Sequence, residues 1–153
     1  MSNLETAFRS LIEAHQLARL QQGLSRLLLA NRFYQEKLAG KERLSLEKPA
    51  DLALFFPFTT KRELVADQAT HPLFGSNLTY PLSDYIRLHQ TSGTTGHPLK
   101  ILDTPESWDW WADCWTTVYQ GAGVTRDDFV FLAFGFGPFI GFSIVSPRLP
   151  NTV

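Results

Sequence analysis

The sequence has little cysteine, little net charge and no long uninterrupted hydrophobic run. Its one cysteine, Cys114, cannot form a disulfide within the chain or build a cysteine-based zinc site, and this predicts a protein of the reducing cytoplasm. The formal net charge is -1 and no block of Lys or Arg stands out. We therefore expect neither nucleic acid nor an anionic membrane surface as the main partner.

The longest nearly uncharged segment, residues 129–145, is interrupted by Gly135, Gly137, Pro138 and Gly141. A membrane-spanning helix needs roughly 20 apolar residues, so we interpret this segment as buried strand and loop. The N-terminus also lacks the basic and apolar regions of a secretory signal. With 153 residues, 44% of them hydrophobic, the chain has enough apolar material for one globular domain.

Helical patterns occupy residues 1–40. Ser2 and Glu5 have the spacing of a capping box, and apolar side chains then recur at helical intervals. Gly23 lies inside this pattern and is a point where the region is expected to divide into two helices. Gly40 follows the pattern, and glycine is a common helix stop. This helical region contains no group of residues typical of a ligand site.

Residues 41–83 are expected to be a connector that contains one short helix. Thr60 and Glu63 form a second capping box directly after an apolar cluster, which predicts a helix that continues through Ala69. We interpret this element as a packing element rather than a site of chemistry.

Two glycines, one serine and three threonines fill residues 91–96, directly after a segment from Asp84 with the composition of a strand. Glycine lets backbone N–H groups approach a ligand closely, and hydroxyls add donors, so the stretch suits a polyanion such as a nucleoside triphosphate. A solvated turn explains the same composition. A second strand is expected over residues 99–102, which would make a hairpin around the glycines.

A further helix is predicted to start with Thr104 as its cap and Pro105 at its first position. Apolar side chains then share one face, as is usual for a helix packed on a core: Trp108, Trp111, Ala112, Trp115, Val118 and Tyr119. Gly121 or Gly123 ends this helix, and the apolar run 129–133 predicts a strand covered on both faces. Strand, helix and strand in that order predict an α/β fold.

The standard phosphate-binding patterns do not fit this sequence. Only two residues separate Gly93 from Gly96, whereas the Walker A pattern has four and then a lysine, which is absent here. Glycines near residue 137 lack the spacing of the dinucleotide fingerprint. The G-x-S-x-G and H-E-x-x-H patterns are also missing, which removes the common hydrolase and zinc-protease hypotheses.

Residues 91–96, followed by Pro98, resemble the phosphate-binding loop of the adenylate-forming enzymes, the acyl-CoA synthetase superfamily. Further stretches resemble the phenylacetate-CoA ligase branch in order and spacing: Asn31-Arg32-Phe33-Tyr34-Gln35-Glu36-Lys37-Leu38, Pro57-Phe58-Thr59-Thr60-Lys61-Arg62-Glu63-Leu64, Arg87-Leu88-His89, Ala122-Gly123-Val124, Asp127-Asp128 and Ala133-Phe134-Gly135-Phe136-Gly137. The resemblance covers residues 27–142. It implies an α/β fold in which N-terminal helices precede the beginning of the large domain of such an enzyme, with the strand, loop, helix and strand over residues 84–142.

The resemblance also implies a reaction and a site. Such enzymes join a carboxylate, here expected to be an aryl acid, to ATP with release of pyrophosphate, and then pass the acyl group to coenzyme A. The expected contacts to the ATP phosphates, beside Mg²⁺, are Thr91, Ser92, Gly93, Thr94, Thr95 and Gly96. The expected wall of the carboxylate pocket is Phe134, Gly135, Phe136 and Gly137, although packing explains these four almost as well. No catalytic residue or metal ligand is assigned.

Two features depart from the family pattern. His97 stands where the family usually has Lys or Arg, and a mostly neutral imidazole is a weaker phosphate partner. The similarity also ends near Phe142, which leaves residues 143–153 as an atypical tail. Family members continue with nucleotide contacts, an acidic magnesium ligand and the lysine that promotes adenylation. We therefore expect residues 1–153 to be a truncated, partial N-terminal domain that is inactive alone.

Two alternatives stay open. One is a non-catalytic fragment that binds nucleotide or a partner protein, or that self-associates through an exposed sheet edge and the tryptophans at 108, 111 and 115. The other is a complete small α/β domain in which the glycine-rich stretch is coincidental. Calorimetry with ATP and sedimentation distinguish the first alternative from a ligase fragment.

Overall fold

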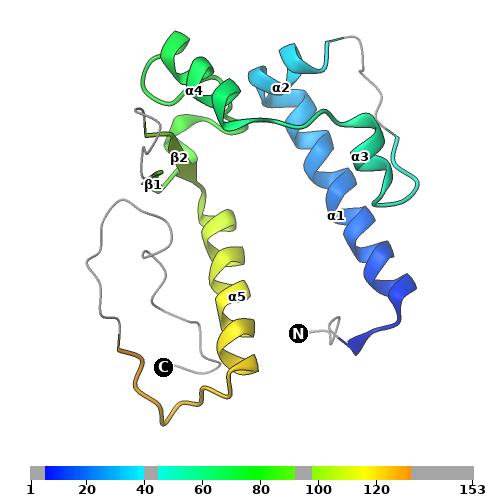
Figure 1. Ribbon diagram of the computed structural model, residues 1–153, viewed down its shortest axis with the longest axis vertical. Coiled ribbons are helices and arrows are strands. Elements are labelled where there is room, and N and C mark those ends of the chain that lie inside the picture. The colour runs from blue at the N-terminus through cyan, green and yellow to red at the C-terminus, as the bar shows by residue number, and fades with distance from the viewer. Residues whose placement is uncertain (1–5, 40–44, 92–97, 132–153) are drawn as a thin grey trace. The chain divides into compact units, whose positions relative to one another are not determined.

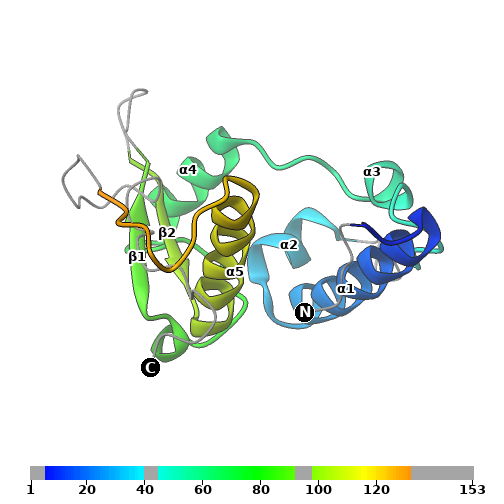
Figure 2. The same ribbon diagram turned by 90° about the horizontal axis from the view of Figure 1, so that it is seen from below.

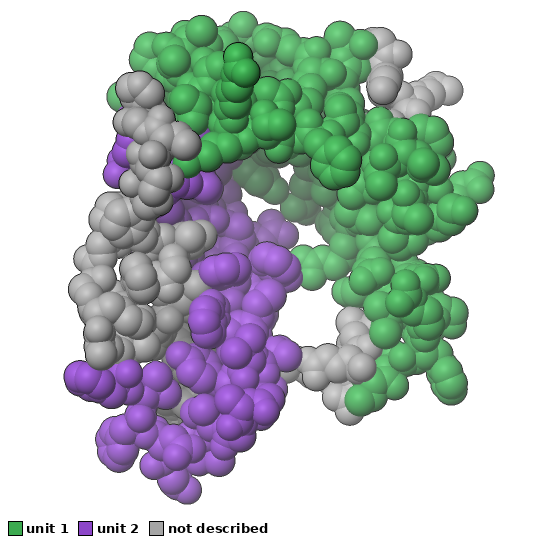
Figure 3. All heavy atoms as spheres, viewed as in Figure 1, with its two compact units in different colours: residues 1–80 green, residues 81–153 purple. Residues whose placement is uncertain are grey.

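The computed structural model describes residues 6–39, 45–91 and 98–131. The chain divides into two compact units, residues 1–80 and residues 81–153 (Figure 3).

Four α-helices form the described part of the first unit (Figure 1). Their bounds are Arg9–Ala30 for α1, Arg32–Lys37 for α2, Asp51–Phe55 for α3 and Lys61–Thr70 for α4. Among the described residues of this unit, the buried apolar side chains are Leu24, Leu38 and Leu46. They come from α1, from the end of α2 and from the approach to α3, and the Gln21 side chain of α1 donates to the Leu46 carbonyl at 2.9 Å, which joins that approach to α1.

The long helix α1 runs through Gly23 without a break, so the predicted division at that residue is wrong. One glycine costs a helix only about 1 kcal/mol, and the leucine-rich turns on either side continue the helix. The break comes at Asn31, which has extended backbone angles and whose Oδ1 accepts a hydrogen bond from the Tyr34 N–H at 3.2 Å. The predicted capping box at Ser2 and Glu5 lies outside the described residues.

The capping box predicted at the start of α4 is confirmed. The Thr60 hydroxyl accepts a hydrogen bond from the Glu63 N–H, and the Glu63 carboxylate accepts one from the Thr60 N–H at 2.7 Å. Helix α4 then extends to Thr70, one residue beyond the predicted end. Helix α3 was not predicted; in it the buried Asp51 accepts hydrogen bonds from backbone N–H groups of the turn before it.

The described part of the second unit consists of a two-stranded hairpin followed by a helix. A short 3-10 helix, Leu82–Asp84, leads into strand β1, Arg87–Gln90, which pairs antiparallel with β2, Lys100–Asp103. The predicted hairpin is therefore confirmed. Helix α5, Pro105–Gly121, follows β2 directly and contacts it, and lies beside the strands in Figure 2.

Helix α5 begins as predicted, because the Thr104 hydroxyl accepts a hydrogen bond from the Ser107 N–H at 3.2 Å and Pro105 takes the first helical position. The apolar stripe is buried only in part. Within it, Ala112 is buried, whereas Val118 is 57% exposed; the polar Thr116, which is outside the stripe, is also buried.

The predicted strand at residues 129–133 does not form over its described part. Residues 129–131 have no strand pairing, and Phe129 is fully exposed. The prediction rested on an apolar run, but a strand covered on both faces needs neighbouring strands and two covering layers. Over residues 81–91 and 98–131, the second unit offers a sheet of two strands. No helix within the described ranges is both long and apolar enough to cross a membrane.

Candidate functional site

The two ends of the glycine-rich stretch meet at one pair of residues, Thr91 and Leu99. The Thr91 N–H donates to the Leu99 carbonyl at 3.0 Å, and the Leu99 N–H donates to the Thr91 hydroxyl at 2.9 Å. Leu99 is buried, with 6% of its surface exposed. We call this doubly bonded pair the Thr91–Leu99 neck. It places Thr91, the first residue of the stretch, beside the residue that follows Pro98.

Two residues before the neck on β1, the hairpin buries the imidazole of His89 beside a carboxylate of β2. His89 on β1 is 3% exposed, and its Nε2 lies 3.2 Å from Oδ2 of Asp103 on β2. The two groups are not aligned for a hydrogen bond, and both ring nitrogens and Oδ2 lack a hydrogen-bond partner among the described residues. The other oxygen, Oδ1, accepts a hydrogen bond from the Ser107 hydroxyl at 3.0 Å. Asp103 thus links the hairpin to the first turn of α5.

The first turn of α5 also contributes an aromatic ring to this cluster. The Trp108 indole stacks on the His89 ring with centroids 5.5 Å apart and 14° between the planes. The Arg87 guanidinium lies 4.4 Å from the centroid of the same indole, a distance at which a cation–π contact is favourable. Because His89 and Arg87 are two apart on β1, their side chains point to the same face of the hairpin, and Trp108 covers both.

The structure describes one of the ten predicted site residues, Thr91. Its hydroxyl accepts a hydrogen bond from the Leu99 N–H. The other phosphate-contact predictions, Ser92, Gly93, Thr94, Thr95 and Gly96, lie outside the described residues, as do His97 and the pocket predictions Phe134, Gly135, Phe136 and Gly137. These assignments stay predictions.

The described residues do not supply a metal site. Within residues 6–39, 45–91 and 98–131, no three His, Cys, Asp or Glu side chains gather closely enough to hold a metal ion. The Mg²⁺ that the sequence resemblance implies is therefore not assigned to any described residue. The basic residue beside the neck is Lys100, the first residue of β2, which is half-buried.

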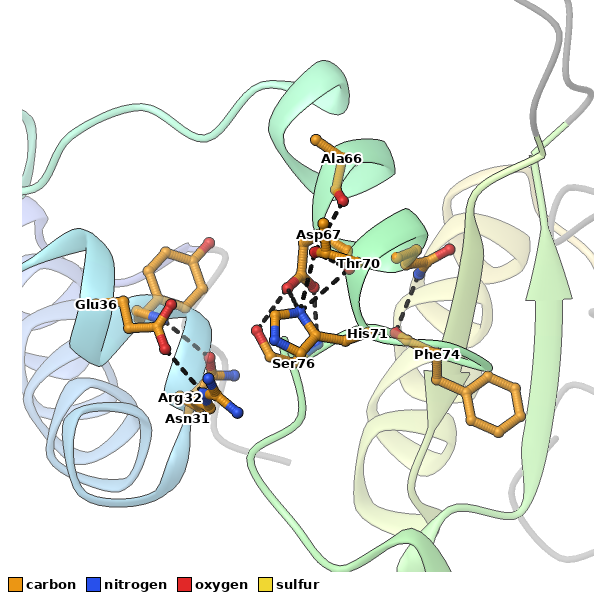
Figure 4. Close-up of polar contacts among 11 residues, drawn as sticks. Asn31, Arg32, Glu36, Ala66, Asp67, Thr70, His71, Phe74 and Ser76 are labelled. Atoms are coloured by element: carbon orange, nitrogen blue, oxygen red, sulfur yellow. Dashed lines mark hydrogen bonds and ion pairs between the residues drawn. The ribbon is translucent and has the colours of Figure 1, made fainter.

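The first unit contains a separate hollow of about 440 Å³ between α2 and α4. On one side of it, the Asp67 carboxylate accepts hydrogen bonds from the Ser76 N–H at 2.7 Å and the Ser76 hydroxyl at 2.6 Å, and contacts Nδ1 of His71 at 3.0 Å (Figure 4). The Asp67 side chain is 8% exposed. This network stabilises the fold by joining the end of α4 to the segment that follows it.

On the other side of the hollow, Lys37 of α2 bonds the Glu63 carboxylate and donates to the Phe58 carbonyl at 2.7 Å. The hydrogen bond from Lys37, with those from the Thr60 N–H and hydroxyl, lowers the pKa of Glu63 from 4.5 to about 2. The lysine thus ties α2 to the capping box of α4. Sequence reasoning identified the capping box and missed the lysine, because Lys37 and Glu63 are 26 residues apart.

Comparison with known proteins identifies relatives, although no family model matches the chain. Phenylacetate-coenzyme A ligase of Pseudomonas putida is 32% identical over 140 residues, which are 90% of this chain and 30% of that protein. The enzyme of the same name from Escherichia coli (strain K12) is 30% identical over 140 residues, 31% of its length. The chain therefore spans about 30% of these relatives.

Solved structures agree with the sequence relatives. The crystal structure of 2-hydroxyisobutyryl-CoA ligase in complex with 2-HIB-AMP and CoA in the thioesterification state matches with a TM-score of 0.72 at 28% identity. The match covers 80% of this chain and 26% of the ligase. A second structure of that ligase, in the postadenylation state, matches with a TM-score of 0.69. The shared fold is the N-terminal part of these enzymes.

Proposed function

Because this chain is a relative of the phenylacetate-coenzyme A ligases and matches the N-terminal part of adenylate-forming CoA ligases, we propose that it supplies the ATP-phosphate-binding part of such a ligase. The whole enzyme would adenylate a carboxylate with ATP and convert it to a coenzyme A thioester. An aryl acid is the proposed carboxylate, since the sequence relatives are named for phenylacetate.

The observation that carries this proposal is the hairpin with its Thr91–Leu99 neck. The neck holds together the ends of a stretch rich in backbone N–H and hydroxyl donors. Donors held close together favour an anion with several oxygens and offset the charge that builds on a departing pyrophosphate. We assign the phosphate contacts to Ser92, Thr94 and Thr95, with the amides of Gly93 and Gly96.

The remaining partners follow from the same proposal. Coenzyme A is the proposed acyl acceptor, supported by the related ligase solved with 2-HIB-AMP and CoA. The aryl group would lie against Phe134, Gly135, Phe136 and Gly137, and Mg²⁺ would accompany the phosphates. A cytoplasmic location belongs to this proposal too and is supported by the single Cys114.

We further propose that the chain by itself binds MgATP without completing the reaction, because it spans about 30% of the relatives that carry the activity. The test is calorimetry of the purified chain with MgATP, with the double variant Thr94→Val, Thr95→Val as the sensitive form. Thr117→Val is the control, since that hydroxyl bonds a backbone carbonyl on the exposed side of α5. Binding that the double variant loses and the control keeps supports the proposal.

A second assay measures pyrophosphate release from MgATP, coenzyme A and phenylacetate. No release is expected from the chain alone. Sustained release would refute the proposed inactivity, whereas an absence of MgATP binding to the wild-type chain would refute the phosphate-binding function.

Self-association is a second candidate property. Large apolar side chains are exposed in the second unit, above all Phe129 and Phe131, the latter at 88%, and contiguous apolar surface favours contact between molecules. Sedimentation velocity over a concentration series tests this candidate, with Phe129→Ser, Phe131→Ser as the variant. A concentration-independent monomer would exclude it.

A further inference from the structure

At the neck, a side-chain hydroxyl accepts a hydrogen bond that a backbone carbonyl accepts in an ordinary antiparallel ladder. In the register of the hairpin, Gln90 faces Lys100, so Thr91 faces Leu99 as the next pair. The Thr91 N–H to Leu99 carbonyl bond shows that this is a hydrogen-bonded pair. In such a pair each residue normally donates to the carbonyl of the other. Here the Leu99 N–H donates to the Thr91 hydroxyl instead of the Thr91 carbonyl.

This exchange has a direct geometric consequence. The side-chain hydroxyl completes the last rung of the ladder, so the Thr91 carbonyl is not needed to satisfy the buried Leu99. The backbone is then able to leave the ladder immediately after residue 91 without exposing an unpaired N–H group inside the unit. A serine or threonine hydroxyl provides this acceptor at residue 91, and a valine of the same shape does not.

Helix α5 also fixes the hairpin that carries the neck. The stack of Trp108 on His89 and the bond from Ser107 to Asp103 attach both strands to the first turn of α5. The backbone on either side of the glycine-rich stretch is therefore fixed by the β1–β2 ladder, by the Thr91 hydroxyl and by the contacts to α5.

We propose that Thr91 is a positioning residue for the phosphate-binding stretch. Its hydroxyl binds the Leu99 N–H, which sets the separation and direction of the two backbones that enter and leave the stretch. This inference rests on the proposed function, because the position of the stretch matters to a ligand only if that stretch binds phosphate. It adds a role to the one expected from the sequence, in which Thr91 was grouped with the phosphate contacts.

The test uses the full ¹⁵N-labelled chain and two readouts, amide hydrogen exchange at Leu99 and calorimetry with MgATP. Thr91→Val removes the acceptor with little change of shape, and Thr91→Ser restores it. Thr117→Val is the matched control, since it removes a hydroxyl bonded to a backbone carbonyl elsewhere in the same unit. In Thr91→Val we expect Leu99 to exchange about tenfold faster or more and MgATP to bind roughly tenfold more weakly. Thr91→Ser and the control stay near wild type in both readouts.

The outcomes separate the possible errors. If Thr91→Val weakens MgATP binding while Leu99 exchange is unchanged, Thr91 is a direct phosphate contact and the proposal is wrong. Faster exchange with unaltered MgATP affinity shows that the neck does not position the ligand site, which also overturns it. If the wild-type chain binds no MgATP, the proposed function fails and this role of Thr91 fails with it, while the Leu99 exchange rates still decide whether the hydroxyl stabilises the neck.

Discussion

The rings of His89 and Trp108 stack across the junction of hairpin and helix, 5.5 Å apart and nearly parallel. This contact joins β1 to α5, as does the Arg87 guanidinium that lies over the same indole. We expect Trp108→Ala to destabilise the second unit by about 2 to 3 kcal/mol, from lost burial and lost ring contact. Urea unfolding measures it. Trp110→Ala, at a residue that is 50% exposed, should cost less than half as much, and equal costs would contradict a special role for the stack.

The lowered pKa of Glu63 predicts how the first unit responds to acid. A carboxyl with a pKa of about 2 in the folded chain, against an ordinary 4.5, contributes stability that is fully present above pH 4.5. That stability is lost as the pH falls toward 2, because Lys37 and Thr60 bond the ionised form. The free energies of unfolding of wild type and Glu63→Gln should therefore converge over this pH range.

The control for this acid effect is Glu36→Gln. Glu36 pairs with Arg32 on the surface, and both side chains are more than half exposed, so little change in stability is expected. A wild type and a Glu63→Gln variant that stay equally far apart at all pH values would contradict the role of the Glu63 carboxylate.

We expect replacement by alanine to have opposite effects on folding stability at two glycines, Gly75 and Gly23. Gly75 has a φ of +84°, and a Cβ atom there would collide with the Asp67 carboxylate, so Gly75→Ala should destabilise the chain by about 2 kcal/mol or more. Gly23 lies within α1 with open space around it, and Gly23→Ala should stabilise the helix by about 0.5 to 1 kcal/mol. Thermal unfolding of both variants gives the signs, and a shift of the same sign in both would refute this explanation.

Among the polar residues of the first unit, we expect substitution of Asn31 to cause the largest loss of folding stability. Its side chain is almost fully buried, caps α2, and donates to Asn77 at 2.9 Å and Thr79 at 3.1 Å. Asn31→Ala should cost about 2 to 3 kcal/mol, the sum of a lost cap and unpaired buried partners. Asn31→Asp keeps the cap acceptor and loses the donor, so its cost should be smaller. Gln22→Ala, on the exposed side of α1, is the control and should change stability little.

The sequence predicted the elements whose signals are local. The caps at Thr60 and Thr104 depend on residues three positions away along the chain, and the hairpin depends on two short apolar segments around glycines. Such contacts are readable because their geometry is repeated within one turn. The strand at 129–133 was predicted wrongly over its described part, because an apolar run does not state which neighbours will cover it.

The phosphate-binding hypothesis also came from the sequence, because it depends on residue types and their spacing. The structure contributes the neck beside that stretch and a different use for Thr91. No pattern distinguishes a threonine hydroxyl that binds a ligand from one that binds a backbone N–H eight residues away. The decision depends on the hairpin register, which is a three-dimensional relationship.

By itself, the sequence determined the helical first part, the capped starts of α4 and α5, the hairpin and the kinship with CoA ligases. These follow from short-range hydrogen bonding and from residue order. Only the tertiary structure decided that the buried Asn31 bonds Asn77 and Thr79, that Lys37 bonds Glu63, and that His89 is buried between Asp103 and Trp108. These relationships join residues far apart in the chain, and burial and packing select them after the local elements have formed.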